Sequence, residues 1–144
     1  MQLLLTEAVQ PMKFEMLIDP TLEYDKNRIS VIRQFIRFVV KKMKIDGFFR
    51  VVFTTEKEKL GVKTTAYYRD TDKVLVVYSK NRMLGDSLRS VAHELVHKKQ
   101  YEDGRITHPV QDVGGEIEDE ANAKAGSLIK LFIKSNPLSK YMFD

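Results

Sequence analysis

The spacing of apolar residues changes twice along this chain, and this pattern most constrains the fold. In residues 25–45 apolar side chains recur every three or four positions, which predicts an amphipathic helix, with Asp25 as its N-cap and Asp46-Gly47 as its end. Residues 84–103 and 116–135 have the same spacing, and Gly104 and Pro137 follow them as helix terminators. Because Gly85-Asp86-Ser87 stands at the start of the second segment, we expect cap chemistry there.

Residues 48–79 have a different pattern, with β-branched and aromatic runs typical of strands. We expect strands over 48–55, 64–69 and 73–79, with a tight hairpin turn at Asp70-Thr71-Asp72. Strands that precede helices favour an α+β fold with a small antiparallel or mixed three-stranded sheet. Residues 1–24 contain Pro11 and Pro20 and show no clear period, so they are predicted to form an irregular arm. The length of 144 residues predicts one domain over 1–144.

Composition limits the chemistry that is available. The chain has no Cys, which excludes disulfides, thiolate-bound metals and thiol catalysis, so a metal site must use His, Asp and Glu. The net charge of +4 comes from 24 basic and 20 acidic residues, so the charge alone predicts no nucleic-acid partner. The apolar runs are too short to cross a bilayer, and no signal peptide is recognisable. We therefore expect a cytoplasmic protein that has no membrane contact.

One short motif within the second predicted helix indicates a metal site. Residues 93–97 read His-Glu-Leu-Val-His, and positions four apart lie one above the other on a helix. His93 and His97 can therefore bind one Zn²⁺, at about 2.0–2.1 Å from each imidazole nitrogen. Glu94 points about 100° away from His93, so it is a candidate general base that reaches a zinc-bound water.

A catalytic zinc needs a third protein ligand, and several residues could supply it. Glu118 is favoured because it lies near the centre of the apolar stripe of the last predicted helix. Asn122 follows one turn later and could orient a ligating His through its second nitrogen. Glu120 and His108 remain alternatives, while Glu116 and Asp119 fit an acidic, solvated helix start.

The two motifs together resemble those of the gluzincin metallopeptidases. The likeness rests on His93-Glu94-Leu95-Val96-His97 and on Glu118-Asp119-Glu120-Ala121-Asn122, and it is closest to the small minigluzincins and the ImmA/IrrE-like peptidases. The resemblance implies a zincin-like domain in which Glu118 is the third ligand and Asn122 supports the site. The metzincin extension is missing, because Gln100 and Asp103 occupy its Gly and His positions. A short chain of this kind would suit a bacteriophage protein acting in its host cell, or a bacterial protein.

The predicted activity is zinc-dependent hydrolysis of peptide bonds in a peptide or protein substrate, with Glu94 as general base. Candidates for stabilising the oxyanion are His108, Tyr101, Arg105 and Tyr67. In the resembling family an extended peptide pairs with an edge strand beside the active-site helix. Here that strand would be 64–69 or 73–79.

Two other functions are kept as alternatives. The first is a metal-binding structural or regulatory protein without turnover. The second is a nucleic-acid-associated domain that uses the basic helix of residues 25–45. Glu94 favours hydrolysis over a structural role, because a structural zinc site prefers four protein ligands and has no use for a carboxylate beside an open position.

Overall fold

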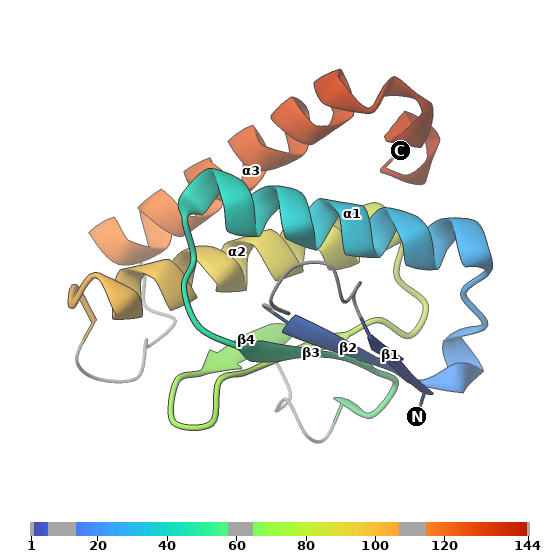
Figure 1. Ribbon diagram of the computed structural model, residues 1–144, viewed down its shortest axis with the longest axis horizontal. Coiled ribbons are helices and arrows are strands. Elements are labelled where there is room, and N and C mark those ends of the chain that lie inside the picture. The colour runs from blue at the N-terminus through green and yellow to red at the C-terminus, as the bar shows by residue number, and fades with distance from the viewer. Residues whose placement is uncertain (1, 6–13, 58–64, 107–114, 144) are drawn as a thin grey trace.

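The computed structural model of the protein describes residues 2–5, 14–57, 65–106 and 115–143. These residues form an α+β fold, which confirms the predicted class, with one sheet covered by helices (Figure 1). The strands are β1 (Gln2–Leu5), β2 (Phe14–Ile18), β3 (Phe49–Thr54), β4 (Ala66–Arg69) and β5 (Val74–Tyr78). The helices are α1 (Lys26–Met43), α2 (Leu84–Glu102) and α3 (Glu116–Ser135), with 3-10 turns η1 (Pro20–Leu22) and η3 (Pro137–Met142).

The sheet is mixed, and its strand order is β1-β2-β3-β5-β4. Strand β3 pairs in parallel with β2 on one side and β5 on the other, while β1 and β4 are the antiparallel outer strands. The predicted hairpin is confirmed, because β4 and β5 pair with Arg69 opposite Val74 across the turn. Since parallel neighbours need a crossover, α1 connects β2 to β3.

The structure corrects two predictions about the sheet. Within the described ranges the sheet has five strands instead of three, because β1 and β2 lie in the segment predicted as an irregular arm. In β2, Phe14, Met16 and Ile18 point into the core and alternate with two half-buried residues, which is a strand pattern. Its partner β3 lies beyond α1 in the sequence, so no hairpin signal marks this pairing.

The three predicted helices are confirmed, with ends that differ by a few residues. The Asp25 side chain caps α1 by accepting a hydrogen bond from the Arg28 backbone N–H at 2.8 Å. At α2 the predicted cap chemistry is wrong, because Met83 is the N-cap and makes no side-chain cap hydrogen bond. Ser87 instead lies buried in the helix, and its hydroxyl donates to the Ser79 hydroxyl at 3.0 Å.

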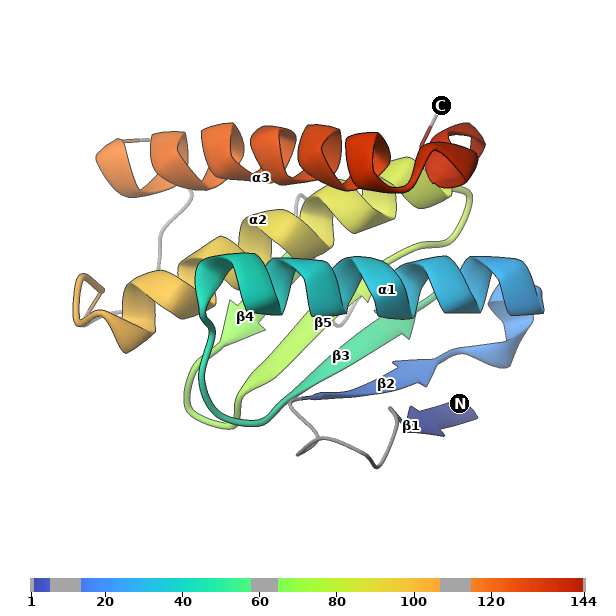
Figure 2. The same ribbon diagram turned by 45° about the horizontal axis from the view of Figure 1, so that its top comes forward.

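The helices form two layers above one face of the sheet. Helices α1 and α2 lie side by side over the strands, and α3 packs on α2 on the side away from the sheet (Figures 1 and 2). Helix α2 is therefore held between the sheet, α1 and α3. None of the helices in the described ranges has an apolar stretch long enough to cross a membrane.

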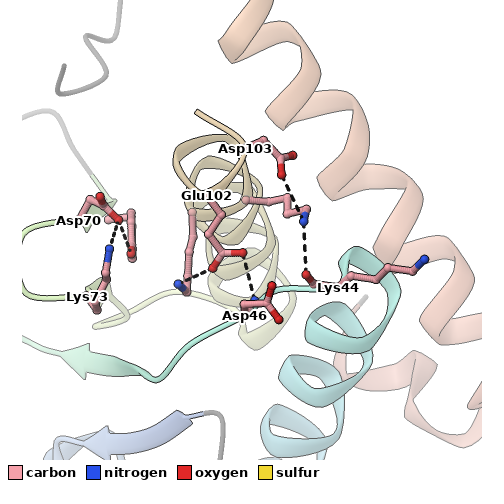
Figure 3. A network of polar contacts seen from close by, with 9 residues as sticks. Lys44, Asp46, Asp70, Lys73, Glu102 and Asp103 are labelled. Atoms are coloured by element: carbon pink, nitrogen blue, oxygen red, sulfur yellow. Dashed lines mark hydrogen bonds and ion pairs between the residues drawn. The ribbon is translucent and has the colours of Figure 1, made fainter. Parts of the chain in front are cut away.

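Polar contacts fix the C-terminal end of α2 to its surroundings (Figure 3). The Lys98 ammonium lies 2.7 Å from Glu102, and Glu102 also accepts a hydrogen bond from the Asp46 backbone N–H at 3.0 Å. The Lys98 ammonium lies 5.7 Å and 5.8 Å from the ring centres of Phe49 and Tyr68. These contacts join α2 to the segment after α1 and to two strands, so the helix that contains His93 and His97 is firmly placed.

Candidate metal centre

His93 and His97 lie one turn apart on α2, as the sequence predicted. Their Nε2 atoms are 3.2 Å apart, and the two rings stand nearly perpendicular, at 86°. Helix geometry places both side chains toward α3, and His97 is only 3% exposed. The two imidazoles therefore present nitrogen atoms to a common point between the helices.

Glu118 reaches the same point from the first turns of α3. Its Oε2 atom lies 3.1 Å from His93 Nε2, and its Oε1 atom lies 2.7 Å from His97 Nε2. One ligand atom from each of the three residues lies within 4.8 Å of the others, so this group could hold a metal ion. The structure thus brings together the two histidines and the carboxylate that the sequence analysis favoured.

The geometry of this group fits a small divalent cation. Ligand atoms at about 2.0–2.1 Å from a tetrahedral ion are about 3.3 Å from one another. The observed separations of 2.7–3.2 Å are at or slightly below this value, so only a small outward adjustment would seat an ion. Two imidazoles and one carboxylate form the donor set of catalytic zinc sites with an open fourth position.

The environment favours a neutral His93 imidazole, which is the form that binds a metal. Burial is the largest effect and lowers the pKa of His93, and the nearby His97 lowers it further. Glu118 and a hydrogen bond with Asn122 act in the opposite direction. Asn122 lies one turn after Glu118 on α3 and makes this hydrogen bond with His93.

Glu94 and Glu120, the other two acidic candidates, occupy different positions. Glu94 is largely buried, and its Oε2 atom lies 4.0 Å from His93 Nε2, beside the ligand group. Glu120 Oε1 accepts hydrogen bonds from Gln100 at 2.9 Å and from Arg105 at 2.6 Å. These two hydrogen bonds, the one from Gln100 first, lower the pKa of Glu120. Glu120 is therefore engaged away from the point where the three ligand atoms meet.

Gln100 is a site residue that the sequence analysis missed. Its Oε1 atom lies 2.7 Å from His97 Nδ1, and its side chain is buried beneath α3. In the sequence, Gln100 stood out only as a departure from the metzincin pattern. Its position three residues after His97, on the same side of the helix, was the available signal.

Of the four residues proposed from the sequence to stabilise the oxyanion, the three that the structure describes do not lie together. His108 lies outside the described residues. Arg105 pairs with Glu120, and the Tyr101 ring packs 5.9 Å from that of Tyr68. Tyr67 is paired with Val76, and its neighbours in β4 face the helices, so Tyr67 lies on the opposite face of the sheet. This register argues against Tyr67 as a group that acts on a substrate at His93 and His97.

Comparison with known proteins gives no named relative. No family model matches the chain, and neither a curated protein nor a solved structure matches it. The residues of the centre themselves offer two imidazole nitrogens and a carboxylate at one point, with a second carboxylate beside them.

Proposed function

We propose that the protein is a zinc-dependent metallopeptidase that hydrolyses peptide bonds at the group formed by His93, His97 and Glu118. The observation that carries this proposal is the meeting of three ligand atoms from two helices, with the Glu94 carboxylate beside them. Three protein ligands leave a fourth position for water or substrate, as a catalytic site requires. A structural zinc site would be expected to close that position with a fourth side chain.

The residues of the chain have distinct roles in this reaction. Zinc, when bound, supplies Lewis acidity that polarises the scissile carbonyl and makes the attacking water more acidic. Glu94 accepts the proton of that water and then donates it to the leaving amine. Its Oε2 atom lies 4.0 Å from His93 Nε2, beside the three ligand atoms, which is near enough to meet the water. Asn122 and Gln100 hold the two imidazoles in orientation.

The sheet offers a place for an extended peptide substrate. Of the two strands considered from the sequence, β5 lies between β3 and β4 and is paired on both sides, whereas β4 is an outer strand among the residues that the structure describes. Helix α2 packs against β4, with the Tyr101 ring 5.9 Å from that of Tyr68. A peptide added to the outer edge of β4 would be held through main-chain hydrogen bonds and would lie beside α2.

The test is hydrolysis of a peptide library by the purified, zinc-loaded protein, with cleavage products identified by mass spectrometry. Glu94→Gln keeps the size of the side chain and removes the base, so we expect a loss of about 10²–10⁴-fold in rate with zinc content unchanged. Glu116→Gln is the matched control, because Glu116 is exposed at the start of α3, and it should retain full activity.

Three results would overturn the proposal. The first is the absence of stoichiometric zinc, and the second is the absence of cleavage by the zinc-loaded protein. The third is equal cleavage by the Glu94→Gln variant, because the activity would then come from another site or from a contaminant. Zinc binding without cleavage would instead support the metal-binding structural role.

A further inference from the structure

The Gln100 amide is buried between α2 and α3 and makes three polar contacts. Its Nε2 atom donates to the Ile117 backbone carbonyl at 3.2 Å and to Glu120 Oε1 at 2.9 Å. Its Oε1 atom lies 2.7 Å from His97 Nδ1. The side chain is only 1% exposed, so water cannot readily replace any of these partners.

The partners of Gln100 determine which end of the amide faces which group. A backbone carbonyl and a carboxylate can only accept hydrogen bonds, so the NH₂ group must point toward Ile117 and Glu120. The amide oxygen must then point toward His97, and an amide oxygen can only accept. His97 must therefore carry a proton on Nδ1 in order to donate to Gln100.

A proton on Nδ1 decides what the other nitrogen of His97 can do. In the neutral ring it leaves the lone pair on Nε2, which is the atom that lies 3.2 Å from His93 Nε2 and 2.7 Å from Glu118 Oε1. Gln100 thus selects the tautomer in which Nε2 is available as a ligand. The same hydrogen bond fixes the rotation of the imidazole ring.

Glu120 in turn holds Gln100 in this orientation. The Glu120 Oε1 atom accepts from Gln100 and, at 2.6 Å, from Arg105, which lies after the end of α2. We infer that Glu120 is a positioning residue of the metal centre, which acts through Gln100 to set the tautomer and ring orientation of His97. The inference rests on the proposed metal site, but its first readout requires no metal and no substrate.

The first experiment is ¹⁵N NMR of the imidazoles in metal-free and zinc-loaded protein, with His97 assigned by substitution. We expect a proton on Nδ1 of His97 in both states. The inference is overturned if Nδ1 is the unprotonated nitrogen in the unaltered protein. Such a result would refute this inference without bearing on the proposed peptidase activity. If the protein instead fails to bind zinc, the proposed function is refuted, while the tautomer of His97 in the metal-free protein can still be measured.

The second experiment measures zinc affinity by competition with a chelator. Gln100→Met keeps the side-chain length and removes the amide, and Glu120→Met removes the acceptor that holds it. Each variant should bind zinc about 10–100-fold more weakly, because loss of a group that orients a ligand costs affinity of this order. Asp119→Asn is the control, since this exposed neighbour on α3 loses the same charge, and it should change the affinity less than twofold.

The double variant distinguishes action through Gln100 from a general effect on α3. In the Gln100→Met background, Glu120→Met should cause no further loss of zinc affinity, because its link to His97 is already broken. Independent, additive losses would overturn the inference. If Gln100→Met does not fold, the Glu120→Met variant still decides the question, because a zinc affinity equal to that of the Asp119→Asn control would overturn the inference.

Discussion

Glu118 on α3 places its Oε1 atom 2.7 Å from the Nε2 atom of His97 on α2, so the two helices meet at the proposed ligand group. An ion bound there joins the helices only in the folded state and should stabilise it. At a free zinc concentration of 100 times Kd, the free energy of unfolding should rise by about 2.7 kcal/mol. This corresponds to a Tm increase of roughly 9 °C for a chain of this length.

Thermal unfolding with and without zinc measures this effect. Glu118→Ala should lose most of the zinc-dependent shift, because only two imidazoles remain as ligands. Glu116→Ala removes an exposed carboxylate from the same turn of α3 and should keep the shift. A zinc-dependent Tm increase that is equal in both variants would place the ion elsewhere on the protein.

Removing one partner of the buried ion pair of Lys98 and Glu102 should destabilise the fold. The Lys98 side chain is 2% exposed and that of Glu102 is 17% exposed, so replacing the lysine leaves a poorly solvated carboxylate. Lys98→Met should therefore lower the free energy of unfolding by about 3 kcal/mol, the low end for a broken buried pair because Glu102 is partly exposed, and urea denaturation measures this cost. The neighbouring Lys99 pairs at 3.3 Å with Asp103, whose side chain is 46% exposed, so Lys99→Met should cost less than about 1 kcal/mol. Equal costs would show that burial of the pair is unimportant.

Asp19 should make the stability of the fold depend on pH in acid. Hydrogen bonds from the Thr55 hydroxyl, then from the Thr21 backbone and hydroxyl, lower the pKa of Asp19 to about 2. Because the pKa is lowered in the folded state, the stabilisation is complete above the unfolded value of about 3.9 and is lost as the pH falls through about 2.

Carbon NMR titration of the Asp19 carboxyl group measures this pKa directly. Thr55→Val removes the largest contribution, so the pKa should move up toward its ordinary value. Thr55→Ser keeps the hydroxyl and serves as the control. A pKa near 3.9 in the unaltered folded protein would contradict the prediction.

Two helical glycines should respond in opposite directions when replaced by alanine. A Cβ atom at Gly85 would lie 2.7 Å from the Phe143 carbonyl oxygen and 2.8 Å from its Cα, so the C-terminal backbone would have to move. Gly85→Ala should lower the free energy of unfolding by about 1–3 kcal/mol. At Gly126 a Cβ atom meets nothing within 4 Å, so Gly126→Ala should raise it by up to about 1 kcal/mol. Chemical denaturation of both variants tests this, and stabilisation by Gly85→Ala would disprove the close approach.

The helices could be predicted from the sequence because their signals are local. Each signal lies within or next to the helix that it marks. Examples are the three- and four-residue spacing, the Asp25 cap of α1 and Pro137 after α3. The strands β1 and β2 could not be placed in the same way. The pairing of β2 with β3 spans the whole of α1, and such non-local contacts leave no turn signature in the sequence.

In the candidate site, too, the residues with local signals could be predicted and those that depend on contacts between elements could not. The His93 and His97 spacing is a property of one helix, and Glu118 could be favoured from its place on the stripe that faces the neighbouring helix. The role of Gln100 depends on a backbone carbonyl and a carboxylate of another helix, which fix the direction of its amide. No spacing within α2 can convey that direction. The place of Tyr67 likewise follows from strand register, which the sequence left undetermined.

The placement of Glu118 on α3 also has a consequence for local opening of the fold. The two imidazoles belong to α2, whereas the carboxylate belongs to α3, so the three ligand atoms are together only while these two helices are docked on each other. An ion bound there would therefore be released when α3 separates from α2, even if the sheet and α2 stay folded. Metal exchange would then measure how often the third helix detaches.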